Sequence, residues 1–238
     1  RRGPPPPTPT AIPPTPISQV QPRPGSTVAA MIVTIPPQID GDLSDWVLGV
    51  NQISHVVFGA ENWSSVADLS GRFLAGWDAS RLYLGVQVVD DVYVQTQTGQ
   101  NLFRGDSVEI LFDADLAGDY YTQSMSPDDY QLGISAGGPG PGVYPEAFLW
   151  YPAGQSGSRP QVNIAAKPAP DGYVVEFSIP WSILGVSSPA AGARFGFVLS
   201  LSDNDLPGSN NQQTMMSNNP TRILTDPTSW GNLILVLP

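Results

Sequence analysis

The sequence has no cysteine and a single histidine, His55, among its 238 residues. The lack of cysteine excludes a disulfide framework, thiol catalysis, Cys-ligated zinc and iron–sulfur clusters. With one histidine, a catalytic triad or a multi-histidine metal site is very hard to build. No apolar run approaches the roughly 20 residues of a membrane-spanning helix, so we expect no membrane insertion.

Positive charge is also scarce. The chain carries 10 Lys and Arg residues against 21 Asp and Glu residues, which gives a net charge of −11. Such a chain should repel nucleic acid, because its binding would release too few counterions to offset the repulsion. We therefore expect no nucleic-acid partner.

Proline, glycine and aspartate are abundant instead. There are 26 prolines and 24 glycines, and most of the 21 acidic residues are Asp rather than Glu. These three residue types favour turns and loops, whereas Glu and Lys favour helix surfaces. The composition therefore indicates an all-β protein with long acidic loops.

Residues 1–26 differ from the rest, being rich in proline and threonine and free of acids. Proline runs such as residues 4–7 favour an extended polyproline II spacer. Because the chain begins at Arg1 with no visible signal peptide, we expect a processed form or a fragment. We interpret this segment as a linker to other domains of an exported protein, although a disordered tail has the same composition.

From residue 27 onward, short strand-like runs alternate with turn signals up to residue 238. One helical turn is expected at 180–184, where a proline stands in first position. Many short strands at regular spacing indicate a sandwich or a barrel. About ten strands are predicted, at residues 28–35, 70–76, 82–89, 107–112, 130–134, 147–151, 162–167, 173–179, 194–201 and 232–237.

A series of short motifs lies in order between residues 38 and 237. The first is Ile-Asp-Gly-Asp-Leu-Ser-Asp-Trp at 39–46. The others are Gly-Trp-Asp at 76–78, Leu-Tyr-Leu-Gly-Val at 82–86, Asp-Asp at 90–91, Arg-Gly-Asp-Ser-Val-Glu-Ile at 104–110, Asp-Tyr-Gln at 129–131, Gly-Tyr-Val-Val-Glu at 172–176, Ile-Pro-Trp at 179–181, Asp-Pro at 226–227 and Trp-Gly-Asn-Leu at 230–233. In this order they resemble the family 9 carbohydrate-binding modules.

The resemblance implies an antiparallel β-sandwich of two sheets, in the wider group that includes DOMON-type heme and sugar domains. It also implies a non-catalytic module of an extracellular or cell-surface protein that binds a poly- or oligosaccharide. In that family, two tryptophans enclose a sugar, and a glutamate, an arginine and amides bond its hydroxyls. Aromatic rings stack on the apolar faces of a pyranose, while planar polar groups bind adjacent hydroxyls.

Four positions of this chain align with that sugar site. Glu109 matches the glutamate, and Phe103 aligns with the first tryptophan. Gln131 stands at the position of the arginine, and Leu224 replaces the second tryptophan. We expect Phe103 to stack on the sugar, and Glu109, Gln131 and Arg104 to bond its hydroxyls. Arg104 has an alternative role, which is to pair with its neighbour Asp106.

Two tryptophans outside the shared motifs are alternative stacking platforms. Trp63 lies in a loop-like stretch, and Trp150 lies in a strand where alternate residues face outward. Each could equally cover the edge of the core.

Acidic clusters predict calcium sites. Asp113, Asp115 and Asp119 share a short turn, and Asp128 and Asp129 return before the next strand. Oxygen ligands in a flexible loop suit Ca²⁺, which also occurs in the resembling family; the alternative is a solvated acidic turn. Two further acidic groups are less distinctive: Asp203 and Asp205 near Asn210 and Gln212, and Asp40, Asp42 and Asp45, which more often cap turns.

The sequence bears on three other functions. Catalysis is not expected, because the acids cluster in turns and only Glu109 and Glu176 lie within predicted strands. Heme is not expected, because the spacing of the possible axial ligands His55, Lys167, Met125, Met215 and Met216 does not favour it. The remaining alternative is a structural module of the cell surface that has lost sugar binding and assembles through its sheet edges.

Overall fold

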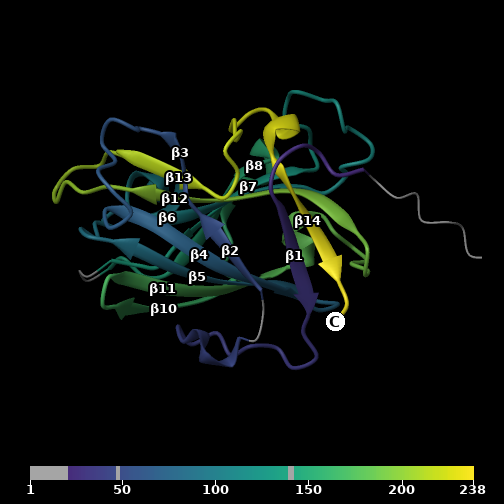
Figure 1. Cartoon of the computed structure of the whole chain (residues 1–238), viewed down its shortest axis with the longest axis horizontal. Coiled ribbons are helices and arrows are strands. Elements are labelled where there is room, and N and C mark those ends of the chain that lie inside the picture. The colour runs from purple at the N-terminus through teal and green to yellow at the C-terminus, as the bar shows by residue number, and fades with distance from the viewer. Residues whose placement is uncertain (1–20, 47–48, 139–141) are drawn as a thin grey trace, which may run out of the picture.

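In the described part of the chain, fourteen strands form one continuous sheet that curls into a two-layered sandwich (Figure 1). The structure, a computed structural model, describes residues 21–46, 49–138 and 142–238. The strands are β1 (Thr27–Ile32), β2 (Val50–Ile53), β3 (His55–Phe58), β4 (Leu69–Trp77), β5 (Arg81–Asp90), β6 (Ser107–Asp113), β7 (Asp129–Ser135), β8 (Glu146–Tyr151), β9 (Gly157–Ser158), β10 (Asn163–Ala169), β11 (Gly172–Pro180), β12 (Arg194–Asp203), β13 (Thr214–Ser217) and β14 (Gly231–Val236).

One layer contains β10, β11, β5, β4 and β2. The other contains β14, β12, β6, β7, β8 and β9, with β13 paired to β12 and β3 paired to β13. The strand β1 joins the layers, because it pairs in parallel with β14 on one side and with β4 on the other. The other pairings are antiparallel.

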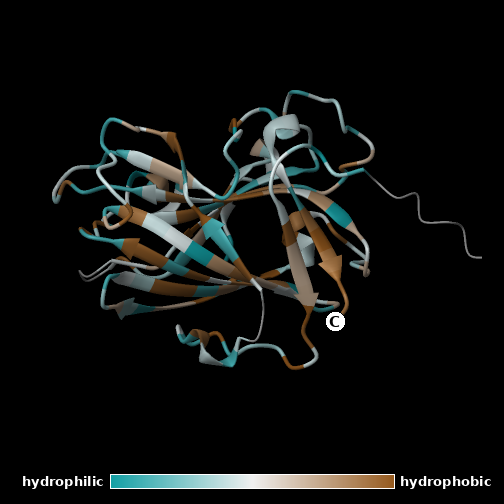
Figure 2. Cartoon of the chain, viewed as in Figure 1, coloured by the Kyte–Doolittle hydropathy of each residue, from teal (hydrophilic) through white to brown (hydrophobic). Residues whose placement is uncertain are grey.

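The core lies between the layers. The rings of Phe73 in β4 and Phe197 in β12 approach to 6.2 Å between centroids. Alternate residues of each central strand supply this core, as Leu82, Leu84 and Val86 do in β5. Figure 2 shows hydrophobic residues along the strands of both layers and mostly hydrophilic loops.

Both faces of β6 are buried. Val108, Ile110 and Phe112 point into the core. On the outer face, Leu111 packs with Val198 and Trp230 in a small separate cluster. All seven residues of β6 are therefore buried.

The all-β sandwich and all ten predicted strands are confirmed, and the expected helical turn is the 3-10 helix η4 (Trp181–Leu184). The sequence pattern does not predict four short strands, namely β2, β3, β9 and β13. Among the described residues, no helix has the length and hydrophobicity that crossing a membrane requires. The other 3-10 helices are η1 (Leu43–Asp45), η2 (Gly99–Arg104), η3 (Ala153–Gln155) and η5 (Pro227–Ser229).

The motif at 39–46 forms a loop that Glu176 holds in place. One carboxylate oxygen of this fully buried side chain accepts hydrogen bonds from the backbone N–H groups of Asp40 at 2.9 Å, Gly41 at 2.5 Å and Asp42 at 3.1 Å. The other carboxylate oxygen of Glu176 accepts a hydrogen bond from the indole N–H of Trp46 at 2.5 Å. The Asp42 side chain caps η1, so the turn-capping interpretation of this acidic group holds for it.

We predict that Glu176→Gln lowers the free energy of unfolding by about 3 kcal/mol, because an amide nitrogen would then face buried N–H donors. Urea denaturation measures this loss. The control is Asp42→Asn, which keeps a capping oxygen on an exposed residue and should change stability by less than about 0.5 kcal/mol. A Glu176→Gln protein as stable as the parent would contradict the anchoring role.

Candidate functional site

A cleft of about 630 Å³ opens on the outer face of the layer that contains β6. Strands β3, β6, β7, β8 and β13, the helix η2 and the loop at 218–230 contribute to it. Its lining residues are Val57, Phe58, Phe103, Glu109, Gln131, Trp150, Gln212, Met215, Arg222, Ile223 and Leu224.

A charged network forms the floor. Glu109 receives a hydrogen bond from Gln131 at 2.7 Å and forms an ion pair with Arg222 through its other oxygen. The side chains of Arg222 and Glu109 are only 8% and 6% exposed. Because the pair is buried, each partner offsets the desolvation of the other. Glu109 and Gln131, both predicted site residues, therefore lie together.

Arg222 is absent from the residues that the sequence predicts for the site. Its loop is fixed by Trp230, whose indole N–H donates to the Ile223 carbonyl at 2.9 Å, and by Ser229, whose hydroxyl accepts from the Ile223 N–H at 2.8 Å. The only hint of Arg222 in the sequence is its position two residues before Leu224. Nothing in the sequence indicates that this loop folds back onto β6.

One wall of the cleft is aromatic. Phe103 and Trp150 meet edge to face, with 6.0 Å between ring centroids. The Trp150 indole N–H donates to the Gln100 carbonyl at 2.9 Å. Trp150 is the extra residue of a β-bulge in β8, and its ring covers Gly133, where any Cβ would overlap it. Trp150 therefore lies in the wall of the cleft.

A second part of the lining is aliphatic except for the ring of Phe58. Met215, Ile223 and Leu224 form it together with Val57 and Phe58. Leu224, which aligns with the family's second tryptophan, thus lies in the cleft without supplying an aromatic ring.

Two other predicted residues do not line the cleft. Trp63 packs against the core and donates its indole N–H to the Leu69 carbonyl at 2.9 Å. The Arg104 guanidinium lies outside, 5.5 Å from the centroid of the Phe103 ring. Asp106 bonds the Val94 and Asn204 N–H groups instead of Arg104.

The first acidic cluster joins Asp113, Asp119 and Asp129, whose oxygens lie within 4.8 Å of one another. Arg23 enters it and approaches Asp113 at 2.5 Å and Asp119 at 3.2 Å. Although Arg23 belongs to the predicted linker, it is only 2% exposed. One oxygen each of Asp119 and Asp129 has no partner among the described residues.

Two predicted ligands are engaged elsewhere in this turn. Asp115 accepts from the Gly118 N–H at 3.1 Å, and Asp128 accepts from the Ser126 hydroxyl. Neither belongs to the group of converging oxygens found among the described residues.

The second cluster is larger than the sequence indicates. Asp203 and Asp205 meet carboxylates at the ends of neighbouring strands and in nearby loops, rather than the predicted amides. Both oxygens of Asp203, which is 1% exposed, lack a partner among the described residues. Buried carboxylate oxygens without hydrogen-bond partners are suitable ligands for a hard cation such as Ca²⁺. The additional members are Asp68, Asp90, Asp91 and Asp106.

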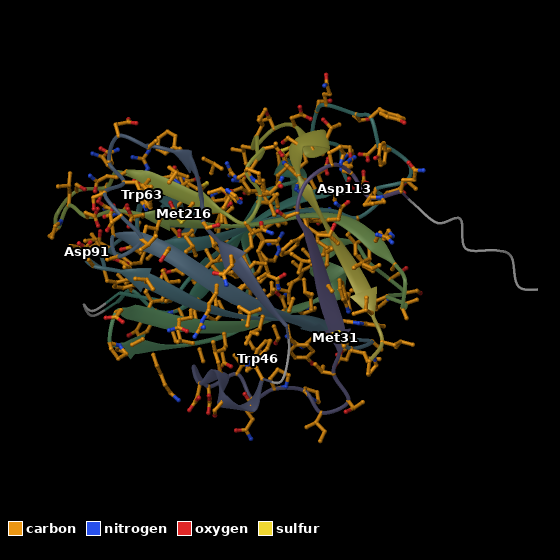
Figure 3. The ribbon with its side chains drawn as sticks, in the orientation of Figure 1. Met31, Trp46, Trp63, Asp91, Asp113 and Met216 are labelled. Carbon is orange, nitrogen blue, oxygen red and sulfur yellow. The ribbon has the colours of Figure 1, made fainter. Side chains whose placement is uncertain are left out.

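Burial dominates the electrostatics of both clusters. It raises the pKa of Asp203 to about 8, with further contributions from the charges of Asp205 and Asp90. Burial also raises the pKa of Asp113 to about 7, although the nearby Arg23 acts in the opposite direction. Figure 3 shows Asp91 and Trp63 toward one end of the sandwich and Asp113 toward the other, so the two clusters are separate.

A family model described as carbohydrate family 9 binding domain-like matches residues 39–237. The chain belongs to this family. Modules of family 9 bind carbohydrate without catalysis, which agrees with the expectation that the chain is not an enzyme.

Solved structures show the same fold. A family 9 module from Caldicellulosiruptor kristjanssonii in complex with cellotriose is 20% identical, with a TM-score of 0.67 over 90% of this chain and 95% of that one. The same module in complex with glucose is also 20% identical, with a TM-score of 0.67 over 90% of this chain and 97% of that one. A putative carbohydrate-binding protein from Bacteroides uniformis is 13% identical, with a TM-score of 0.62 over 89% and 99%. No curated protein matches the chain.

We predict that the metal-free protein loses stability as the pH rises from 5 to 8. The raised pKa values of Asp113 and Asp203 mean that the folded state holds protons that the unfolded state has released. The stabilisation that these two carboxyl groups contribute is fully present below about pH 4, near the pKa of an unfolded Asp. It is lost as the pH rises through their pKa values in the folded state. Thermal unfolding in EDTA should give a Tm at pH 8 at least about 5 °C below that at pH 5.

Asp203→Asn should flatten this profile, because it removes the carboxyl group with the higher of these two pKa values. A Tm that stays constant or rises between pH 5 and 8 would contradict the burial of these charges.

Proposed function

We propose that the cleft binds one sugar unit of a poly- or oligosaccharide and that calcium stabilises the loops of the module. The observation that carries this proposal is the buried Glu109–Arg222–Gln131 network on the floor of a cleft with an aromatic wall. The family membership makes carbohydrate the ligand class, and the network supplies a specific place for it.

The polar floor has the chemistry to bind adjacent hydroxyls. Glu109 accepts from hydroxyl groups, Arg222 donates, and Gln131 does either. The ion pair fixes these groups before a ligand arrives, so little side-chain entropy is lost on binding. Because Arg222 balances the charge of Glu109, the floor suits a neutral sugar, and the related modules with bound glucose and cellotriose support this choice.

The aromatic wall completes the binding mode. The rings of Phe103 and Trp150 offer apolar surface to the C–H groups of a pyranose, whose hydroxyls then reach the floor. No step of bond cleavage is required of any of these residues.

The calcium proposal is best supported at the second cluster. Asp203, Asp90 and Asp106 bring oxygens within 4.8 Å of one another, and Asp205 and Asp68 form an adjoining group with Asp203. A bound Ca²⁺ would neutralise these charges and hold the strand ends together. At the Asp113 cluster, Arg23 already supplies one positive charge, so calcium there stays a prediction.

Export and linkage to other domains remain proposals. Residues 1–20 lie outside the described residues, so the predicted linker conformation is supported by composition alone. An extracellular or cell-surface location fits a module whose ligand is a polysaccharide.

Assembly through sheet edges is the less favoured alternative. The edge strand β10 carries Lys167 and Pro168, both of which oppose pairing with another strand. At the other end of the strand order, β9 has only 2 residues.

Isothermal titration with soluble glycans and their reducing-end sugars tests the binding site. We predict that Glu109→Gln and Phe103→Ala each weaken binding by at least about 30-fold, which corresponds to roughly 2 kcal/mol. Arg104→Gln is the matched control, since its side chain lies outside the cleft, and it should stay within about twofold of the parent. If no sugar releases heat with the folded protein, the structural alternative replaces the binding proposal.

Calcium removal tests the second cluster. We predict that Ca²⁺ raises the Tm of the EDTA-treated protein by at least about 5 °C at pH 8. Asp203→Asn should lose most of this gain, whereas Glu61→Gln, the same charge change at an exposed site, should keep it. An equal gain in both variants would place the stabilising ion elsewhere.

A further inference from the structure

The aliphatic wall of the cleft, formed by Ile223 and Leu224, is exposed to solvent beside the ring of Phe58. Phe58 is 53%, Ile223 55% and Leu224 36% exposed. These side chains belong to β3 and to the loop at 218–230, and Met215 of β13 lies with them in the lining. An exposed apolar patch of this kind on the rim of a polar floor is characteristic of a ligand site.

The two walls therefore recognise different chemistry. The ring of Phe103 or Trp150 stacks on C–H groups while leaving the hydroxyls around the sugar free to reach water or the floor. Branched aliphatic groups such as Ile223 and Leu224 offer neither a flat surface nor a hydrogen bond. A hydroxyl pressed against them loses its water without gaining a partner, whereas a methyl group gains from burial.

The size of the cleft allows such a substituent. Its volume of about 630 Å³ lies in the range of sites for ligands larger than a single unsubstituted ring. The floor formed by Glu109, Arg222 and Gln131 still demands hydroxyls on one edge of the ligand. The ligand thus needs a hydroxyl-bearing edge and a methyl-bearing edge on the same ring.

We propose that the cleft selects a pyranose that carries a methyl group, placed against Ile223 and Leu224, over its fully hydroxylated counterpart. The methyl group belongs either to a 6-deoxy sugar or to an O-methylated sugar. This inference rests on the proposed function, because it specifies the ligand of the same cleft.

Matched pairs of sugars test the selection by isothermal titration. The 6-deoxy arm compares 6-deoxy-D-glucose with D-glucose, L-rhamnose with L-mannose, and L-fucose with L-galactose. The O-methyl arm compares 3-O-methyl-D-glucose and 6-O-methyl-D-glucose with D-glucose. In at least one pair the methyl-bearing member should bind at least about fourfold more tightly, which is the gain from burying one methyl group.

A variant of the wall locates the effect. Leu224→Ser should reduce the preference to below about twofold, because the methyl group would then no longer face an apolar side chain at this position. Val66→Ser is the control, because Val66 is 68% exposed and lies outside the cleft, and it should keep the preference. Unchanged thermal unfolding of both variants would show that they fold.

The outcomes separate the two proposals. Equal or tighter binding of the hydroxylated sugar in every pair would overturn the methyl selection and leave the sugar site standing. The absence of binding to every sugar in both arms would overturn the site itself. A preference that survives in Leu224→Ser would also overturn the inference, because the aliphatic wall would then not cause it.

Discussion

The outer face of β6 imposes the constraint on which the rest of the site depends. Glu109 and Asp113 lie on this face and are 4% and 0% exposed, with Leu111 between them in an apolar cluster. A buried carboxylate without a partner is too costly to keep ionised. Arg222, from a loop near the C-terminal end, reaches Glu109, and Arg23, from the segment before β1, reaches Asp113. Both ends of the folded chain are thus tied to one central strand.

This arrangement links the fold to binding. The loop that delivers Arg222 also contributes Ile223 and Leu224 to the cleft, and it is fixed on the outer face by Trp230, which packs on Leu111. The network that stabilises the covered face therefore also prepares the polar floor. The acidic clusters lie toward opposite ends of the sandwich and contribute no residue to the lining of the cleft (Figure 3).

Local patterns in the sequence predict the strands and the family, because alternation and turn residues are local signals. Glu109 and Gln131 were also predictable, since each lies in a strand whose register the motifs define. Arg222 was not predictable, because its contact with Glu109 spans 113 positions along the chain and depends on how a loop folds back. The same holds for Arg23, whose proline-rich surroundings are typical of a linker, while its side chain enters an acidic pocket.

A double-mutant cycle on Glu109 and Arg222, measured by urea unfolding, tests the central claim most directly. The cycle uses Glu109→Gln, Arg222→Met and the double variant. We predict that each single variant loses about 3 kcal/mol and that the double variant loses less than the sum by at least about 2 kcal/mol, because removing both charges leaves neither buried alone. Losses that add within about 0.5 kcal/mol would contradict the account, since the two charges would then not stabilise one another.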